Sequence, residues 1–207
     1  MGYDVTFHAI SKSELKKYVF DVLDDPSLAA ERSKDIDENE DNQEDIQSIY
    51  DNMLQWISSS PQKCDDFAET FSFAIAAISG YLHDFYYSRN FALSFIEGEH
   101  RVNFLKSFNA INDSPLSNYR DVSGGAISSN YSGSGFSDDP KAILEFVENH
   151  ELAVDEDALD SFKRSLNYCI DNDLLFIEAS DLVVPFTNES YTNTSKMKAH
   201  FLDNITS

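Results

Sequence analysis

Residues 64–95 form the most apolar stretch of this 207-residue chain, and they constrain its fold more than any other segment. They include nine aromatic residues, and residues 71–82 contain no charged side chain. That uncharged run is much shorter than the roughly 20 residues that a membrane-spanning helix needs. Because a helix that is apolar nearly all round is normally buried, we predict a central core helix at about residues 64–87. The apolar residues recur at steps of three and four, which places them on one helical face: Phe67, Phe71, Ile75, Ile78, Leu82 and Phe85.

The remainder of the chain predicts further helices and a few short strands. Residues 3–10 alternate between apolar and polar side chains, which is typical of a half-buried strand. Ser11 and Glu14 have the spacing of a capping box that begins a helix. Helical periodicity is also found at residues 43–57, after Pro140 and after residue 155, and helical character is expected to continue through residues 84–89.

The predicted fold class is α+β and predominantly helical. We expect the helices to pack around the central apolar helix at about residues 64–87. A small sheet is expected to form from the N-terminal strand and from strands near 174–185. Residues 1–207 are predicted to form a single domain, and residues 109–140, rich in Gly, Ser and Asn, are predicted to be a long loop.

The net charge of −22 is the strongest compositional signal. It is unevenly distributed, because residues 21–60 carry twelve acidic residues against two basic ones, and residues 138–160 carry nine against one. Residues 35–45 alone contain seven acidic residues. Charge of this sign repels nucleic acid and anionic lipid and attracts cationic partners over long distances. We therefore expect a basic protein partner, and neither nucleic acid nor a membrane.

Motifs for catalysis or metal binding are missing from the sequence. The EF-hand pattern that begins at Asp35 fails at the two positions that need Gly and Glu, where the chain has Glu40 and Ile46. The five histidines have no paired ligand spacing, and no serine lies in a nucleophile-elbow motif. Cys64 and Cys169 are far apart in apolar contexts, a usage that fits a reducing cytosol. The N-terminus lacks the apolar core of a secretory signal, so a cytoplasmic location is expected. We expect no catalytic residue, metal or cofactor.

In general type, a strongly acidic chain of this size without motifs resembles the bacterial immunity proteins, which neutralise secreted or contact-delivered toxins. The opening MGYDVTFHAIS and the segment SGGAISSNYSGSG carry this resemblance. It implies a non-catalytic protein that binds a cognate toxin tightly and blocks its active site. A nuclease is one such toxin, because an acidic face can occupy a cleft built for phosphates.

The residues expected to contact this partner belong to two acidic segments and to the loop, whose aromatic side chains are candidate anchors. They are Asp35, Asp37, Glu38, Glu40, Asp41, Glu44, Asp45, Asp155, Glu156, Asp157, Tyr119, Tyr131 and Phe136. Two alternatives remain open at this stage. The chain is either a small-molecule-binding protein or enzyme that uses residues 120–137 as a lid over His8 or His83, or a module that assembles with itself.

Overall fold

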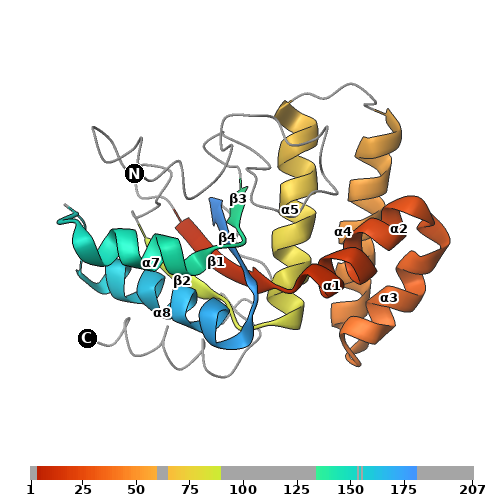
Figure 1. Cartoon of the computed structure of the whole chain (residues 1–207). Coiled ribbons are helices and arrows are strands. Elements are labelled where there is room, and N and C mark those ends of the chain that lie inside the picture. The colour runs from red at the N-terminus through yellow and green to blue at the C-terminus, as the bar shows by residue number, and fades with distance from the viewer. Residues whose placement is uncertain (1–3, 60–64, 90–133, 153, 155, 181–207) are drawn as a thin grey trace.

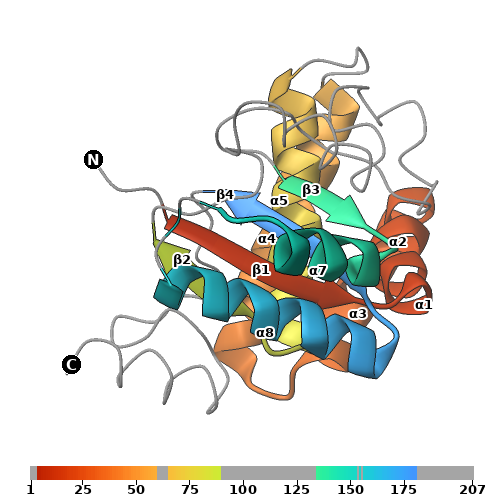
Figure 2. The ribbon, with the colours of Figure 1, turned by 60° about the vertical axis from the view of Figure 1, so that its left-hand side comes forward.

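A four-stranded antiparallel sheet lies between two groups of helices (Figures 1 and 2). The computed structural model describes residues 4–59, 65–89, 134–152, 154 and 156–180. The strand order is β2-β1-β4-β3. The two central strands are β1 (Asp4–Ile10) and β4 (Leu175–Ser180), and the outer strands are β2 (Tyr86–Arg89) and β3 (Ser134–Ser137). The α+β, mostly helical fold class predicted from the sequence is confirmed.

Alternation along β1 supplies both faces of the sheet with buried side chains. Val5, Phe7 and Ala9 belong to the core on one side, together with Phe176 of β4. Ile10 belongs to the core on the other side, with the alternate residues of β4. The prediction of a half-buried strand from this alternation is therefore wrong in one respect. The polar side chains on the second face, Thr6 and His8, are also buried because helices cover both faces.

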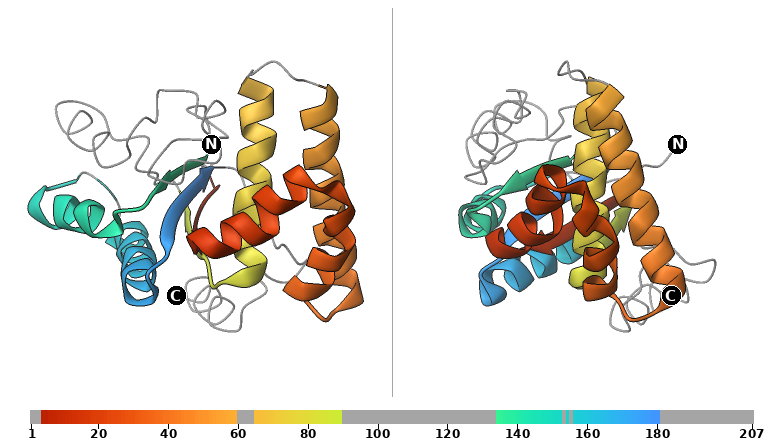
Figure 3. Two further views of the ribbon diagram at one scale, coloured as in Figure 1. Left: turned by 45° about the vertical axis from the view of Figure 1, so that its right-hand side comes forward. Right: turned by 90° about the vertical axis from the view of Figure 1, so that its right-hand side faces the viewer.

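The face of the sheet that carries Ile10, Thr6 and His8 is covered by α5 (Asp65–Leu82), and α4 (Glu40–Ser59) packs on the outside of α5 (Figure 3). From residue 74 to residue 81, α5 is buried at every position. Small side chains let the neighbouring elements approach α5 closely on several sides, and Ala76 and Ala77 are both fully buried. The predicted central apolar helix is confirmed, although it ends at Leu82 rather than near residue 87.

The segment between β1 and α4 folds as a series of short helices. Ser11 begins the first one with the predicted capping box, in which its hydroxyl accepts from the Glu14 amide and the Glu14 carboxylate accepts from the Ser11 amide. The elements that follow are α1 (Lys12–Leu15), a π-helical stretch (Lys16–Phe20), α2 (Asp21–Asp24), a 3-10 turn (Pro26–Leu28) and α3 (Ala29–Ile36).

The opposite face of the sheet, which carries Val5, Phe7 and Ala9, is covered by α7 (Pro140–Asn149) and α8 (Glu156–Asn172) (Figure 3). Asp139 caps α7 through its side chain, which accepts from the Ala142 amide at 3.0 Å, and Pro140 occupies the first turn. Phe162 of α8 is fully buried against Phe7 and Phe176. The sheet thus separates two hydrophobic cores, and each core has its own helices.

Two strands were not predicted. Residues 86–89 form β2, not a continuation of the preceding helix, because they pair with β1 in the register Phe7↔Tyr86. Within the predicted loop 109–140, residues 134–137 form β3 by pairing with β4. The rest of that loop before residue 134 and the predicted strand at 182–185 lie outside the described residues.

Tyr50 joins α4 to the π-helical stretch. Its hydroxyl donates to the Tyr18 carbonyl at 2.7 Å, and its side chain is fully buried. Burial is the main cause that raises the pKa of Tyr50, so the phenol stays protonated. We expect Tyr50→Phe to lower the free energy of unfolding by about 1 kcal/mol, the typical net value of a hydrogen bond. Urea unfolding measures this, with Tyr18→Phe as the control, because the Tyr18 hydroxyl contacts only the partly exposed Lys17 amine in the described structure.

Candidate protein-binding surface

The first acidic segment, residues 35–45, spans the end of α3, a short turn and the first turns of α4. Asn39 caps the start of α4, because its side-chain oxygen accepts from the amides of Asp41 at 2.9 Å and Asn42 at 3.3 Å. Carboxylates in the first turn of a helix interact favourably with the helix dipole. The segment therefore has a well-formed backbone structure.

Asp35 is held by two cations. Its carboxylate lies 3.0 Å from the Lys17 amine and 3.3 Å from the Arg32 guanidinium. The hydrogen bond from Lys17 is the main cause that lowers the pKa of Asp35. These contacts tie α3 to the π-helical stretch, so Asp35 has structural partners within the chain.

Asp37 and Asp45 also have partners within the chain. The Asp37 carboxylate accepts from the Asn39 amide and from the Asn42 side chain, both at 2.8 Å, and so fixes the turn before α4. Asp45 is hydrogen bonded to the Tyr81 hydroxyl of α5. Both carboxylates therefore stabilise the packing of α4.

The remaining four carboxylates of the segment are exposed: Glu38, Glu40, Asp41 and Glu44. Within the described part of the chain, none of them lies within 4 Å of a cationic group. We call these four residues the α4 acidic surface. Four like charges close together repel one another, so a basic partner would relieve an existing cost.

A groove of about 470 Å³ runs between α3 and α4 beside this surface. Glu40, Glu44 and Asp51 lie at helical spacing along the α4 wall, and Lys34 is the cationic residue on the α3 wall. Ala30, Ser33, Gln43, Gln47 and Ser48 complete the lining. The groove therefore joins carboxylates to small polar side chains, a lining suited to long Lys or Arg side chains.

The second acidic segment lies on the other side of the sheet. Glu156 is exposed at the first residue of α8, which packs on the face opposite α4 (Figures 1 and 3). Asp157 belongs to α8 but its side chain is not described, and Asp155 lies outside the described residues. The structure thus does not bring this segment next to the α4 acidic surface.

The predicted aromatic anchors are not placed by the structure. Tyr119 and Tyr131 lie outside the described residues. Phe136 lies in β3, where the backbone is described but the side chain is not. Their role in binding stays a prediction.

One polar cluster was missed from the sequence. His83, which follows α5, hydrogen bonds through Nε2 to the Glu14 carboxylate at 2.9 Å, and its Nδ1 lies 3.5 Å from the Tyr168 hydroxyl. Burial tends to raise the pKa of Glu14, but the hydrogen bonds from His83 and Ser11 outweigh it and the pKa is lowered. Both ring nitrogens of His83 face protein partners, so this arrangement joins α1 to α8 and leaves no free nitrogen for a substrate or metal.

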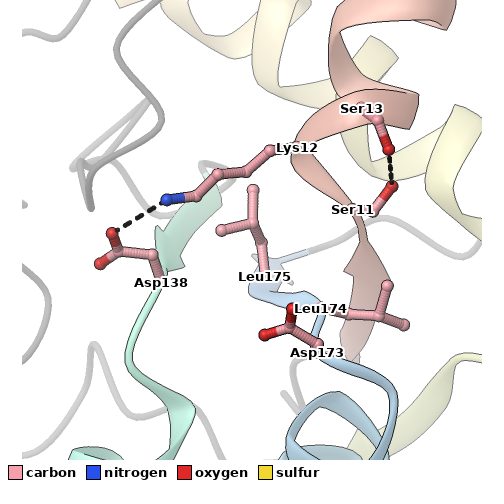
Figure 4. A pocket seen from close by; sticks show the side chains of 7 residues that line it. All are labelled: Ser11, Lys12, Ser13, Asp138, Asp173, Leu174 and Leu175. Atoms are coloured by element: carbon pink, nitrogen blue, oxygen red, sulfur yellow. Dashed lines mark hydrogen bonds and ion pairs between the residues drawn. The ribbon is translucent and has the colours of Figure 1, made fainter.

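A second cavity, of about 420 Å³, lies where β4 begins beside α1 and the end of β3 (Figure 4). Lys12 reaches across it to Asp138 at 3.5 Å, and Asp173 lies on the far side. Ser11, Ser13, Leu174 and Leu175 complete the lining. The lysine charge is matched by Asp138, and the cavity holds fewer carboxylates than the α4 acidic surface.

Comparison with known proteins gives no match to any protein-family model, curated protein or solved structure. Among the described residues, no three His, Cys, Asp or Glu side chains are grouped to hold a metal ion. In the same part of the chain, every helix is too short or too polar to cross a membrane. The geometry of the described residues is therefore the basis for assigning a function.

Proposed function

We propose that this chain is an acidic inhibitor of the immunity-protein type, which binds a basic toxin domain and occludes its active site. The observation that carries the proposal is the α4 acidic surface beside the acidic α3–α4 groove: its four carboxylates are exposed, and none forms an ion pair within 4 Å among the described residues. The partner would present Lys and Arg side chains, as the cleft of a nuclease does. We place the interaction in the bacterial cytoplasm, where the cell that makes the toxin needs protection.

The placement of the carboxylates supports protein binding over simple solubility. Solubility needs only dispersed charge, whereas these carboxylates are concentrated in the first turns of α4 and at Glu38 just before it. A rigid surface binds without the entropy cost of ordering a loop. Complementary charge also increases the rate of association, by about 10-fold or more at low salt.

Catalysis is less well supported by the described residues. The two histidines that a catalytic hypothesis needs are engaged or enclosed: His83 contacts Glu14 and Tyr168, and His8 is 1% exposed. Burial raises the pKa of Cys169 to about 12, which leaves its thiol protonated and unreactive at neutral pH. The segment proposed as a lid, residues 120–137, lies outside the described residues apart from residues 134–137.

Co-expression tests the proposal. Production of the protein encoded by the adjacent gene, the first candidate toxin, is expected to stop bacterial growth, and co-expression of this chain is expected to restore it. Rescue should be lost when Glu38, Glu40, Asp41 and Glu44 are neutralised together. Undiminished rescue by that variant, or adjacent gene products that neither affect growth nor bind this chain, would count against the proposal.

A further inference from the structure

His8 occupies a buried position where a charged side chain would destabilise the folded protein. It lies on β1, the strand that pairs with both β2 and β4, and its side chain is 1% exposed. Its ring stacks on Phe85 with centroids 4.7 Å apart. Nε2 lies 2.8 Å from the Thr6 hydroxyl, whereas Nδ1 is buried and has no hydrogen-bond partner in the described structure.

The surroundings of His8 offer no described counter-ion. On its face of the sheet β4 contributes apolar residues, including Ile177, which pairs with His8. From residue 74 to residue 82, α5 has no charged residue, and its titratable Tyr81 is hydrogen bonded to Asp45. Tyr87 of β2 pairs with Thr6 on the same face.

The charged groups nearby are directed elsewhere. His83 and Asp84 follow α5, and His83 is bound to Glu14 and Tyr168. Glu178 of β4 pairs with Phe7, so it lies on the opposite face of the sheet, toward α8. Among the described residues, a proton on His8 would therefore have no compensating negative charge.

We propose that His8 is an acid sensor whose protonation destabilises the sheet around β1, so that the protein unfolds more readily as the pH falls below about 6.5. The ordinary pKa of Asp and Glu is near 4, so most surface carboxylates are still ionised when this happens. Loss of the fold would release a basic partner, even though the surface carboxylates that attract it are still ionised. This release rests on the function proposed above, whereas the unfolding does not.

The direction of the effect follows from proton linkage. Burial lowers the pKa of His8 to about 3 in the folded protein, from an ordinary value of 6.5. The unfolded chain therefore binds one more proton between these two pH values, and unfolding becomes more favourable as pH falls. The stability is fully present above pH 6.5. Below that value the unfolding equilibrium constant rises about tenfold for each pH unit, down to the folded pKa.

Urea unfolding from about pH 7.5 to about pH 4.5 tests the unfolding, with His8→Gln as the variant. The amide can still bond to the Thr6 hydroxyl but does not titrate. The matched control is His150→Gln, which removes a partly exposed histidine at the end of α7. We expect the wild-type protein and the control to show the tenfold dependence, and His8→Gln to lose it. Parallel loss of stability in all three proteins would overturn the proposal.

A second measurement covers the case in which His8→Gln does not fold. Nitrogen NMR of the histidine rings in the wild-type protein is expected to show His8, recognised by its contacts to Phe85, neutral until the fold is lost. A His8 ring that takes up a proton near pH 6.5 in the intact fold would refute the sensor role. With a bound partner, the urea concentration that releases it should fall between about pH 7.5 and about pH 5 in the wild-type protein and stay nearly constant in His8→Gln. If no partner binds at pH 7.5, the proposed function fails, but the unfolding result stands.

Discussion

Phe162→Ala is expected to lower the free energy of unfolding by about 3–5 kcal/mol, the usual cost of removing a buried aromatic ring. Phe162 is fully buried and contacts two other rings edge to face, Phe7 at 5.1 Å and Phe176 at 5.5 Å between centroids. These rings come from α8, β1 and β4, so their contact holds the second helical layer on the sheet. Removing the ring leaves a cavity that three secondary-structure elements would have to fill.

Urea unfolding of Phe162→Ala measures this effect, with Leu159→Ala as the control. Leu159 lies on the same helix but is only partly buried, so its loss should cost clearly less. A cost below about 1 kcal/mol for Phe162→Ala would mean that α8 is not held by the three-ring contact.

Ala76→Asp is expected to prevent folding, because it would bury an unpaired carboxylate in the middle of α5. Ala76 has no exposed surface, and every residue from 74 to 81 is buried. Removing a charge from water without a partner costs several kcal/mol, which is comparable to the total stability of many domains. The matched control is Asn52→Asp, which adds the same charge at an exposed position of α4. Circular dichroism and urea unfolding compare the two variants, and a stably folded Ala76→Asp would show that α5 is not the buried helix of this fold.

The parts of the fold that were predictable have strong local signals. The apolar periodicity of α5, the alternation of β1 and the capping box at Ser11 each depend on residues close together in sequence, and all three are present. The strand at residues 86–89 was missed because its aromatic residues continue the helical pattern of α5. Residues 134–137, Ser-Gly-Phe-Ser, have little intrinsic preference for a strand, and their conformation is set by pairing with β4.

The candidate site was also only partly predictable, because local sequence signals do not report contacts between distant residues. A count of charges identified the acidic segment, but it could not separate Asp35, Asp37 and Asp45, which have structural partners, from the four carboxylates that have none among the described residues. That distinction depends on contacts with distant residues such as Lys17 and Tyr81. Likewise, 69 residues separate Glu14 from His83, so no local spacing could have indicated their hydrogen bond.

The affinity for the adjacent gene's product, measured by isothermal titration calorimetry, tests most directly whether the α4 acidic surface binds a basic protein. Three proteins are compared: the wild type, a variant with Glu38→Gln, Glu40→Gln, Asp41→Asn and Glu44→Gln, and a matched variant with Glu145, Glu148, Glu151 and Glu156 each changed to Gln. Both variants lose four negative charges, but the second set is exposed on the other side of the sheet. We predict that the α4 variant binds about 100-fold more weakly and that the matched variant stays within about threefold of the wild type. Equal weakening of both variants, or full affinity in the α4 variant, would contradict a binding site on α4.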